Sequence, residues 1–150
     1  MTSRIPPELA VGHDEVDGQH RALFQSIDEM VEAVRADDVA RARPAIARLG
    51  DELLAHFAAE ESFMAATQYP ERGRHKAAHD LFMQDYVKLV RELEQAGLSV
   101  PLVEALTARV PEWFRFHVHV NDVPLGRYLA SKRFRPAAGT SHGDAKPRAS

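Results

Sequence analysis

Seven residues of this chain have side chains suited to binding metal ions, and they fall into four short motifs. Histidine and glutamate stand four apart in HFAAE, and two histidines stand four apart in HKAAH. That spacing places both side chains of a pair on one helix face, one turn apart. Another motif has histidine and aspartate five apart, which fits a helix end better than a helix middle. The seven candidate ligands are His20, His56, Glu60, His75, His79, His117 and Asp122.

Four stretches with helically spaced apolar residues must position these motifs, and no alternation typical of strands occurs. The predicted fold class is therefore all-α. Asp17 is the expected N-cap of the first helix, and Pro44 could delay the start of the second to about Arg43. The predicted helices cover residues 18–35, 39–65, 70–96 and 99–120.

Proline and glycine set the limits of the last two predicted helices. Pro70 is expected at the first helical position of the third helix, and Gly97 is its expected C-terminal stop. Ser99 and Pro101 open the fourth helix. Pro111 should kink or divide that helix, because proline removes a backbone donor and clashes one turn back.

The four motifs lie at the start, end, start and end of successive predicted helices. In an antiparallel up-down-up-down four-helix bundle, these positions all lie at the same level. Taken alone, His20 is better explained as a hydrogen-bonded core histidine, and His56 with Glu60 as an ordinary ion pair. Their shared level favours one dinuclear metal site instead.

Three further histidines are predicted to be incidental. His13 precedes the first helix and is expected on the surface. His119 points roughly 200° away from His117 around a helix. His142 falls in the C-terminal segment.

The candidate ligands offer only nitrogen and oxygen, since the chain has no cysteine. Seven ligands are too many for one tetrahedral zinc ion, which takes four. Two six-coordinate ions that share two carboxylates and one oxygen bridge would leave a single position open for a small ligand. Iron is the natural choice, although the ligand types alone also allow manganese or zinc.

The 150-residue length suits one domain, predicted over residues 1–135. Residues 136–150 are small, polar and aperiodic, and are predicted to form a disordered tail. Basic residues exceed acidic ones after Ser131, so the rest of the chain is more acidic than the net charge of −3 suggests. An acidic body argues against nucleic-acid binding. With no membrane span and no secretory signal recognised, the expected location is cytoplasmic.

Four stretches of this sequence resemble the hemerythrins, in particular their bacterial single-domain form. They are VGHDEVDGQH, HFAAEESFM followed by YP, HKAAH, and WFRFHVHVND followed by PLGRYL, and they span about residues 11–129. The resemblance implies a four-helix bundle with an N-terminal arm, which holds an oxo- or hydroxo-bridged non-haem di-iron centre and binds dioxygen reversibly. It assigns His75, His79 and His117 to one iron and His20 and His56 to the other, with Glu60 and Asp122 as bridges.

Five apolar residues near the ligands are expected to line a dry dioxygen pocket, although each could equally be ordinary core. Phe114 stands where the family commonly has leucine, and its larger ring could slow oxygen access or autoxidation. The five residues are Leu23, Phe57, Trp113, Phe114 and Val118.

The resemblance leaves the cellular role open. A protein that stores, delivers or scavenges dioxygen is the first hypothesis. A module that senses oxygen, iron or redox state and acts on an unknown protein partner is the second. A di-iron enzyme that consumes peroxide or nitric oxide is the third, and it is disfavoured because no spare acid or base is evident. Glu61 is predicted to point outward beside Glu60.

Overall fold

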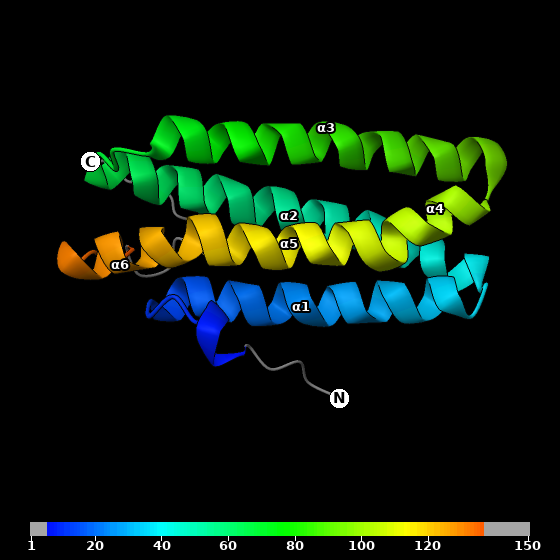
Figure 1. The fold of residues 1–150 in the computed structure, drawn as a ribbon, viewed down its shortest axis with the longest axis horizontal. Helices are drawn as coiled ribbons and strands as arrows, with labels where there is room; N and C mark the ends of the chain where they lie inside the picture. The colour runs from blue at the N-terminus through cyan, green and yellow to red at the C-terminus, as the bar shows by residue number, and fades with distance from the viewer. Residues whose placement is uncertain (1–5, 137–150) are drawn as a thin grey trace, which may run out of the picture.

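The computed structural model describes residues 6–136, and these form the predicted antiparallel four-helix bundle. Figure 1 shows four rods lying side by side, and no strand occurs in this part of the chain. The first three rods are α1 (Asp14–Arg35), α2 (Val39–Thr67) and α3 (Arg72–Ala96). The predicted disordered tail from residue 136 lies, apart from its first residue, outside the described residues.

The fourth rod continues well beyond the predicted end near Val120, because a π-helical turn precedes each of two prolines and the helix continues through them. It consists of α4 (Val100–Glu104), η2 (Ala105–Arg109), α5 (Val110–His117), η3 (Val118–Asp122) and α6 (Val123–Ser131). Each π turn is followed by an α-helical segment whose second residue is proline. Pro111 is the second residue of α5, and Pro124 is the second residue of α6. The wider turn, closed by a bond from residue i+5 to residue i, lets the rod continue past these prolines.

Several predicted helix limits were wrong by a few residues. The first helix begins at Asp14 with His13 as its N-cap, because the Asp17 side chain accepts bonds from the Val11 and Gly12 amides instead. The third begins at Arg72, not at Pro70.

The predicted roles of Gly97 and Ser99 are confirmed, whereas the later start considered for the second helix is not found. The second helix begins at Val39, not near Arg43: Asp38 caps it through the Arg41 amide, and Pro44 lies inside. Gly97 does end the third helix, and Ser99 caps the fourth rod through the Leu102 amide.

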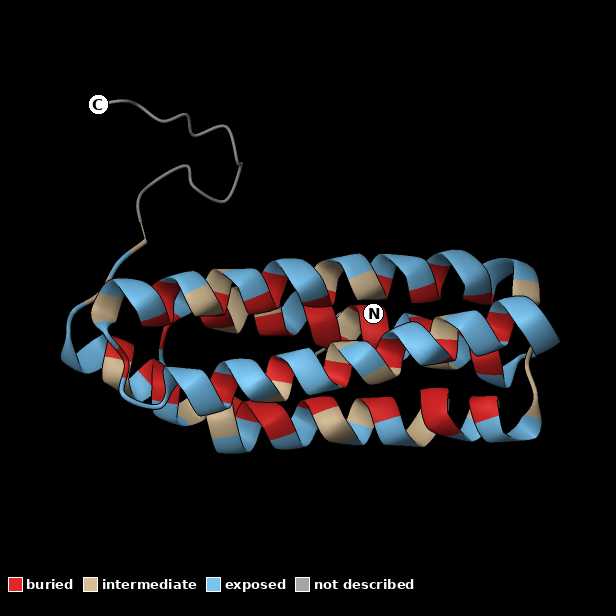
Figure 2. Cartoon of the chain, turned by 90° about the horizontal axis from the view of Figure 1, so that it is seen from above, coloured by how far each residue is buried: buried red, intermediate tan, exposed pale blue. Residues whose placement is uncertain are grey.

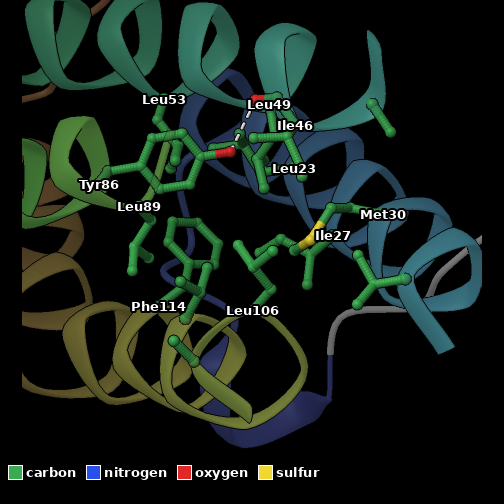
Figure 3. Close-up of a cluster of buried hydrophobic side chains, with 14 of the residues drawn as sticks. Leu23, Ile27, Met30, Ile46, Leu49, Leu53, Tyr86, Leu89, Leu106 and Phe114 are labelled. Carbon is green, nitrogen blue, oxygen red and sulfur yellow. Dashed lines mark hydrogen bonds between the residues drawn. The ribbon is translucent and has the colours of Figure 1, made fainter. Parts of the chain in front are cut away.

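The bundle packs one apolar face of each rod inward, as Figure 2 shows by the buried residues that line the inner sides of the helices. The main cluster fills the half of the bundle away from the four motifs and extends to them. Figure 3 shows Leu23, Leu89, Leu106 and Phe114 pointing into it. Tyr86 closes the cluster by donating a hydrogen bond to the Ile46 carbonyl, at 2.7 Å.

A short N-terminal arm with the single turn η1 (Pro7–Leu9) packs against the side of the bundle, beside the first turns of α1 and in contact with η3. Leu9 and Val11 are buried, and Val11 joins a second apolar cluster with Leu125 and Leu129 of α6. The prediction that His13 lies on the surface was wrong. Its ring is buried between Phe63 and Phe134, and its Nε2 lies 3.3 Å from the Phe134 carbonyl oxygen.

Among residues 6–136, no helix has both the length and the apolar character that a membrane span requires.

Candidate metal centre

All seven predicted ligands meet at one end of the bundle, where α1 and α3 begin and α2 and η3 end (Figure 1). Every one of the seven side chains is buried. A buried group of five imidazoles and two carboxylates is costly unless protons or metal ions link them. The predicted convergence of the four motifs is therefore found in the structure.

The two carboxylates lie between two groups of histidines. Oε1 of Glu60 lies 3.2 Å from Nε2 of both His75 and His79. Its other oxygen, Oε2, lies 3.4 Å from Nε2 of His56 and 3.9 Å from Nε2 of His20. Each oxygen of Glu60 thus faces a different set of imidazoles.

Asp122 repeats this arrangement with its own two oxygens. Oδ1 lies 3.0 Å from Nε2 of His75 and 3.2 Å from Nε2 of His117. Oδ2 lies 2.8 Å from Nε2 of His20 and 3.7 Å from Nε2 of His56. The donor atoms therefore divide into a three-histidine set and a two-histidine set that share both carboxylates.

The donor atoms fit a pair of cations. Within each set, the atoms offered by its residues lie within 4.8 Å of one another. Among the described residues, His56 Nε2, Glu60 Oε2 and Asp122 Oδ1 are buried without a hydrogen-bond partner. Buried polar atoms without partners indicate that an ion is expected among them. Imidazole nitrogen and carboxylate oxygen suit first-row transition metals.

A π turn explains how His117 and Asp122 reach the same site although they are five residues apart. In an α-helix, residues five apart point roughly 140° away from each other. The η3 turn follows His117 and ends at Asp122, and the Val123 amide donates to the Val118 carbonyl to close it. Its larger circumference returns Asp122 to the face of His117. The pair therefore lies within a continuous rod and not at the helix end that its spacing first indicated.

Protons link the site in the metal-free protein. Burial alone would lower the pKa of His56, but the nearby carboxylates of Glu60 and Asp122 outweigh it and raise this pKa to about 10. The same competition raises the pKa of His75 to about 9. For both carboxylates, the effect of burial is outweighed by the neighbouring histidines, so the pKa of Glu60 and that of Asp122 lie below their usual values. Metal binding must therefore displace protons.

We expect the metal-free protein to lose stability in alkaline solution. A pKa raised from 6.5 stabilises the folded state fully below about pH 6.5, and this contribution disappears as pH rises through about 9 for His75 and about 10 for His56. Thermal unfolding of the metal-free protein, followed by circular dichroism, should show a falling midpoint over this range. The exposed variant His119→Ala should behave like the wild type. A midpoint that stays constant or rises between pH 8 and pH 10 would contradict the expectation.

Two ligands are held from outside by polar residues on neighbouring helices. His56 donates from Nδ1 to Oε1 of Gln19, at 2.6 Å, and His79 donates from Nδ1 to Oε2 of Glu61, at 3.0 Å. Because both partners are acceptor atoms, these bonds leave Nε2 directed at the site. The prediction that Glu61 points outward missed its bond to His79, although its side chain remains 29% exposed. Gln19 was missed, and its only sequence signal is an amide beside the ligand His20.

The five predicted pocket residues all lie close to the ligands. Phe57 stacks on His79 and Trp113 stacks on His117, with ring centroids 4.0 Å and 4.7 Å apart. Phe114 presents an edge to His20, with centroids 5.8 Å apart. Leu23 and Val118 are fully buried nearby. Their role in a dioxygen pocket stays a prediction.

A family model and two curated relatives all match this chain to the same protein family. The family model for the "Hemerythrin HHE cation binding domain" matches residues 11–125. The chain is 29% identical to a bacteriohemerythrin of Ralstonia nicotianae, over 83% of this chain and 86% of that protein. It is 30% identical to a bacteriohemerythrin of Pseudomonas aeruginosa, over 77% of this chain and 73% of that protein.

A solved structure shares the fold. The crystal structure of wild-type hemerythrin superposes with a TM-score of 0.78 at 21% identity, and covers 87% of this chain and 98% of that one. Family and fold thus agree with the bundle and with the metal-ligating cluster at its end.

Proposed function

Since the chain belongs to the hemerythrin family, we propose that it binds dioxygen reversibly at a non-haem di-iron centre. The main support for this proposal is that the candidate ligand atoms form two unequal sets that share both carboxylates. Between them, His75, His79 and His117 contact one oxygen of each carboxylate, whereas His20 and His56 contact the other oxygen of each. The two-histidine set offers one protein ligand fewer, so a metal ion there would have one more coordination position for a small ligand.

The protein's own residues favour binding over further chemistry. Five of the seven ligands are imidazoles, which bring no negative charge to stabilise higher oxidation states of iron. The apolar rings of Phe57, Trp113 and Phe114 surround the imidazoles and exclude water from them. Bound iron would supply the electrons for oxygen binding, and the surrounding chain would hold the ligands and keep the site dry. We therefore propose an oxygen-binding protein and not an enzyme.

A direct experiment tests this function. The protein is loaded with iron(II) under anaerobic conditions, its iron content is measured, and it is then exposed to oxygen and afterwards to argon. We expect two iron ions per chain and a visible absorption change that argon reverses. One zinc ion per chain, or an absorption change that never reverses, would overturn the proposal. Steady consumption of peroxide or nitric oxide would indicate an enzyme instead.

Phe114 is expected to limit access to the two-histidine side. Its ring is fully buried and faces His20, His56 and Phe24. Phe114→Leu should open space there, so oxygen release and autoxidation should become faster, at a cost of roughly 1 kcal/mol in unfolding free energy. Stopped-flow release and spontaneous loss of the oxygenated spectrum measure the two rates.

The matched control for this variant is Phe116→Leu on the same helix, because the Phe116 side chain is 62% exposed. It should change neither rate. Unchanged rates in Phe114→Leu, or equal changes in both variants, would show that Phe114 does not control access.

A further inference from the structure

The five ligand imidazoles differ in what their outer nitrogens contact. Nδ1 of His56 donates to Gln19, and Nδ1 of His79 donates to Glu61. Within residues 6–136, Nδ1 of His20, His75 and His117 is buried without a hydrogen-bond partner. Only two of the five ligands are therefore held by a polar side chain at their outer edge.

The two held ligands belong to different metal sets. His56 is in the two-histidine set, and His79 is in the three-histidine set. The two ligand–partner pairs also lie on opposite sides of α2. Gln19 and His56 line the groove between α1 and α2, whereas Glu61 and His79 line the groove between α2 and α3. Each set thus has one ligand whose outer partner reaches the bundle surface.

The two outer partners differ in charge. Gln19 offers a neutral amide oxygen, and its own Nε2 is anchored to Glu15 at 3.5 Å. Glu61 offers a carboxylate oxygen. A hydrogen bond to a carboxylate is roughly twice as strong as one between neutral groups. It also makes the ligating nitrogen of the same imidazole more basic. His79 should therefore bind its metal more strongly than His56 does.

We propose that Glu61 and Gln19 are positioning residues that make the two metal sites unequal, with Glu61 strengthening the three-histidine site through His79 and Gln19 only orienting His56 in the two-histidine site. This inference rests on the proposed di-iron function. The three-histidine site then fills first and holds its metal more tightly. The site with fewer ligands keeps its metal more loosely, which suits a site that must also admit an external ligand.

The test is a stepwise metal titration of the full-length metal-free protein. Iron(II) is added anaerobically against a chromophoric chelator, and the Kd of each step is fitted. Glu61→Gln keeps an acceptor for His79 but removes the charge, so it should weaken the first step by about 10- to 100-fold and leave the second unchanged. Gln19→Leu should weaken only the second step. Gln19→Glu should strengthen the second step and bring the two values together.

A second readout separates electronic from structural effects. The two successive reduction potentials of the loaded protein should move closer together in Glu61→Gln and in Gln19→Glu, because each makes the outer partners alike in charge. Glu112→Gln removes an exposed carboxylate from α5 and should change neither the Kd values nor the potentials. Circular dichroism of the metal-free variants confirms that each is folded, and the two isosteric amide–carboxylate exchanges preserve side-chain shape.

Failure of the proposed di-iron function and failure of the proposed roles of Glu61 and Gln19 would give different results. A wild-type chain that takes up fewer than two iron ions overturns the proposed function and this inference together. If the wild type takes up two ions and binds oxygen reversibly, the inference alone fails in either of two cases. One is a single unresolved binding step, and the other is an equal shift of both steps by each variant.

Discussion

Asp122→Asn is expected to abolish dinuclear metal binding while leaving the bundle folded. The oxygens of the Asp122 carboxylate lie within 4 Å of Nε2 in four of the five histidines. The distances run from 2.8 Å for His20 to 3.7 Å for His56. The amide keeps the shape of the side chain but loses the charge and one of the two acceptor oxygens. It can no longer offer an anionic oxygen to both metal sets. We expect the iron content to fall from two ions per chain to one or none.

The energetic consequence is measurable as lost metal-dependent stability. A metal present at 1,000 times its Kd stabilises a folded protein by about 4 kcal/mol. Loss of an outer partner alone costs roughly 10- to 100-fold in metal affinity, and loss of a bridging ligand should cost more. In the wild type, iron(II) should therefore raise the unfolding midpoint strongly, and in Asp122→Asn this increase should nearly vanish.

His119→Ala is the matched control for this prediction. His119 lies in the same π turn as Asp122, but its side chain is exposed and is not in either ligand set. It should retain two iron ions and the full metal-dependent increase in midpoint. Two tightly bound ions in Asp122→Asn would show that Glu60 alone can bridge the centre.

The convergence of the seven candidate ligands could be predicted from sequence because it depends on spacing along helices. Two side chains four apart share a helix face wherever that helix lies, and antiparallel packing then fixes which ends meet. His56 with Glu60, and His75 with His79, needed no other information. The predicted bundle and the convergence of the motifs are both found in the structure.

The errors arose where contacts between distant segments override local signals. Pro111 predicts a kink or break, but the π turn before it keeps the rod continuous, and the second π turn aligns His117 with Asp122. His13 looked exposed because Phe134, which helps bury it, lies more than a hundred residues away in the chain.

The outer partners of the ligands could not be predicted for a related reason. Gln19 is 37 residues from His56, and Glu61 is 18 residues from His79, so each pairing depends on how two helices are rotated against each other. Spacing within one helix carries no such information. Asp17 misled the prediction of the helix start for a more local reason, since its carboxylate accepts from the amides of Val11 and Gly12 and does not cap the helix.

Gly126→Ala is expected to displace the N-terminal arm. A Cβ at this position would lie 2.4 Å from the Val11 carbonyl oxygen and 2.5 Å from the Val11 Cβ, which is closer than real atoms approach. The nearest atom belongs to the backbone, so a rotamer change of Val11 cannot relieve the clash. The arm is also held by Asp17, whose carboxylate accepts from the Val11 amide at 2.9 Å. Overpacking of this kind costs about 1–3 kcal/mol.

Gly73→Ala is the matched control, because it makes the same chemical change at a position where the added methyl group should not destabilise the fold. A Cβ at Gly73 meets no atom within 4 Å, and the residue lies in the first turn of α3. Alanine should leave stability unchanged or raise it by up to about 1 kcal/mol, through its higher helix propensity. Chemical denaturation measures both variants. In Gly126→Ala, amide hydrogen exchange at residues 9–12 should also become faster, because Leu9 and Val11 lose their buried contacts.

The iron content separates loss of the arm from loss of the metal centre. None of the seven ligands lies on the arm or on α6, so Gly126→Ala should still take up two iron ions per chain. Wild-type stability together with slow exchange at residues 9–12 would show that the arm does not need the close approach at Gly126. A loss of iron would instead mean that the packing of Val11 against Gly126 maintains the position of Asp122, four residues earlier on the same rod.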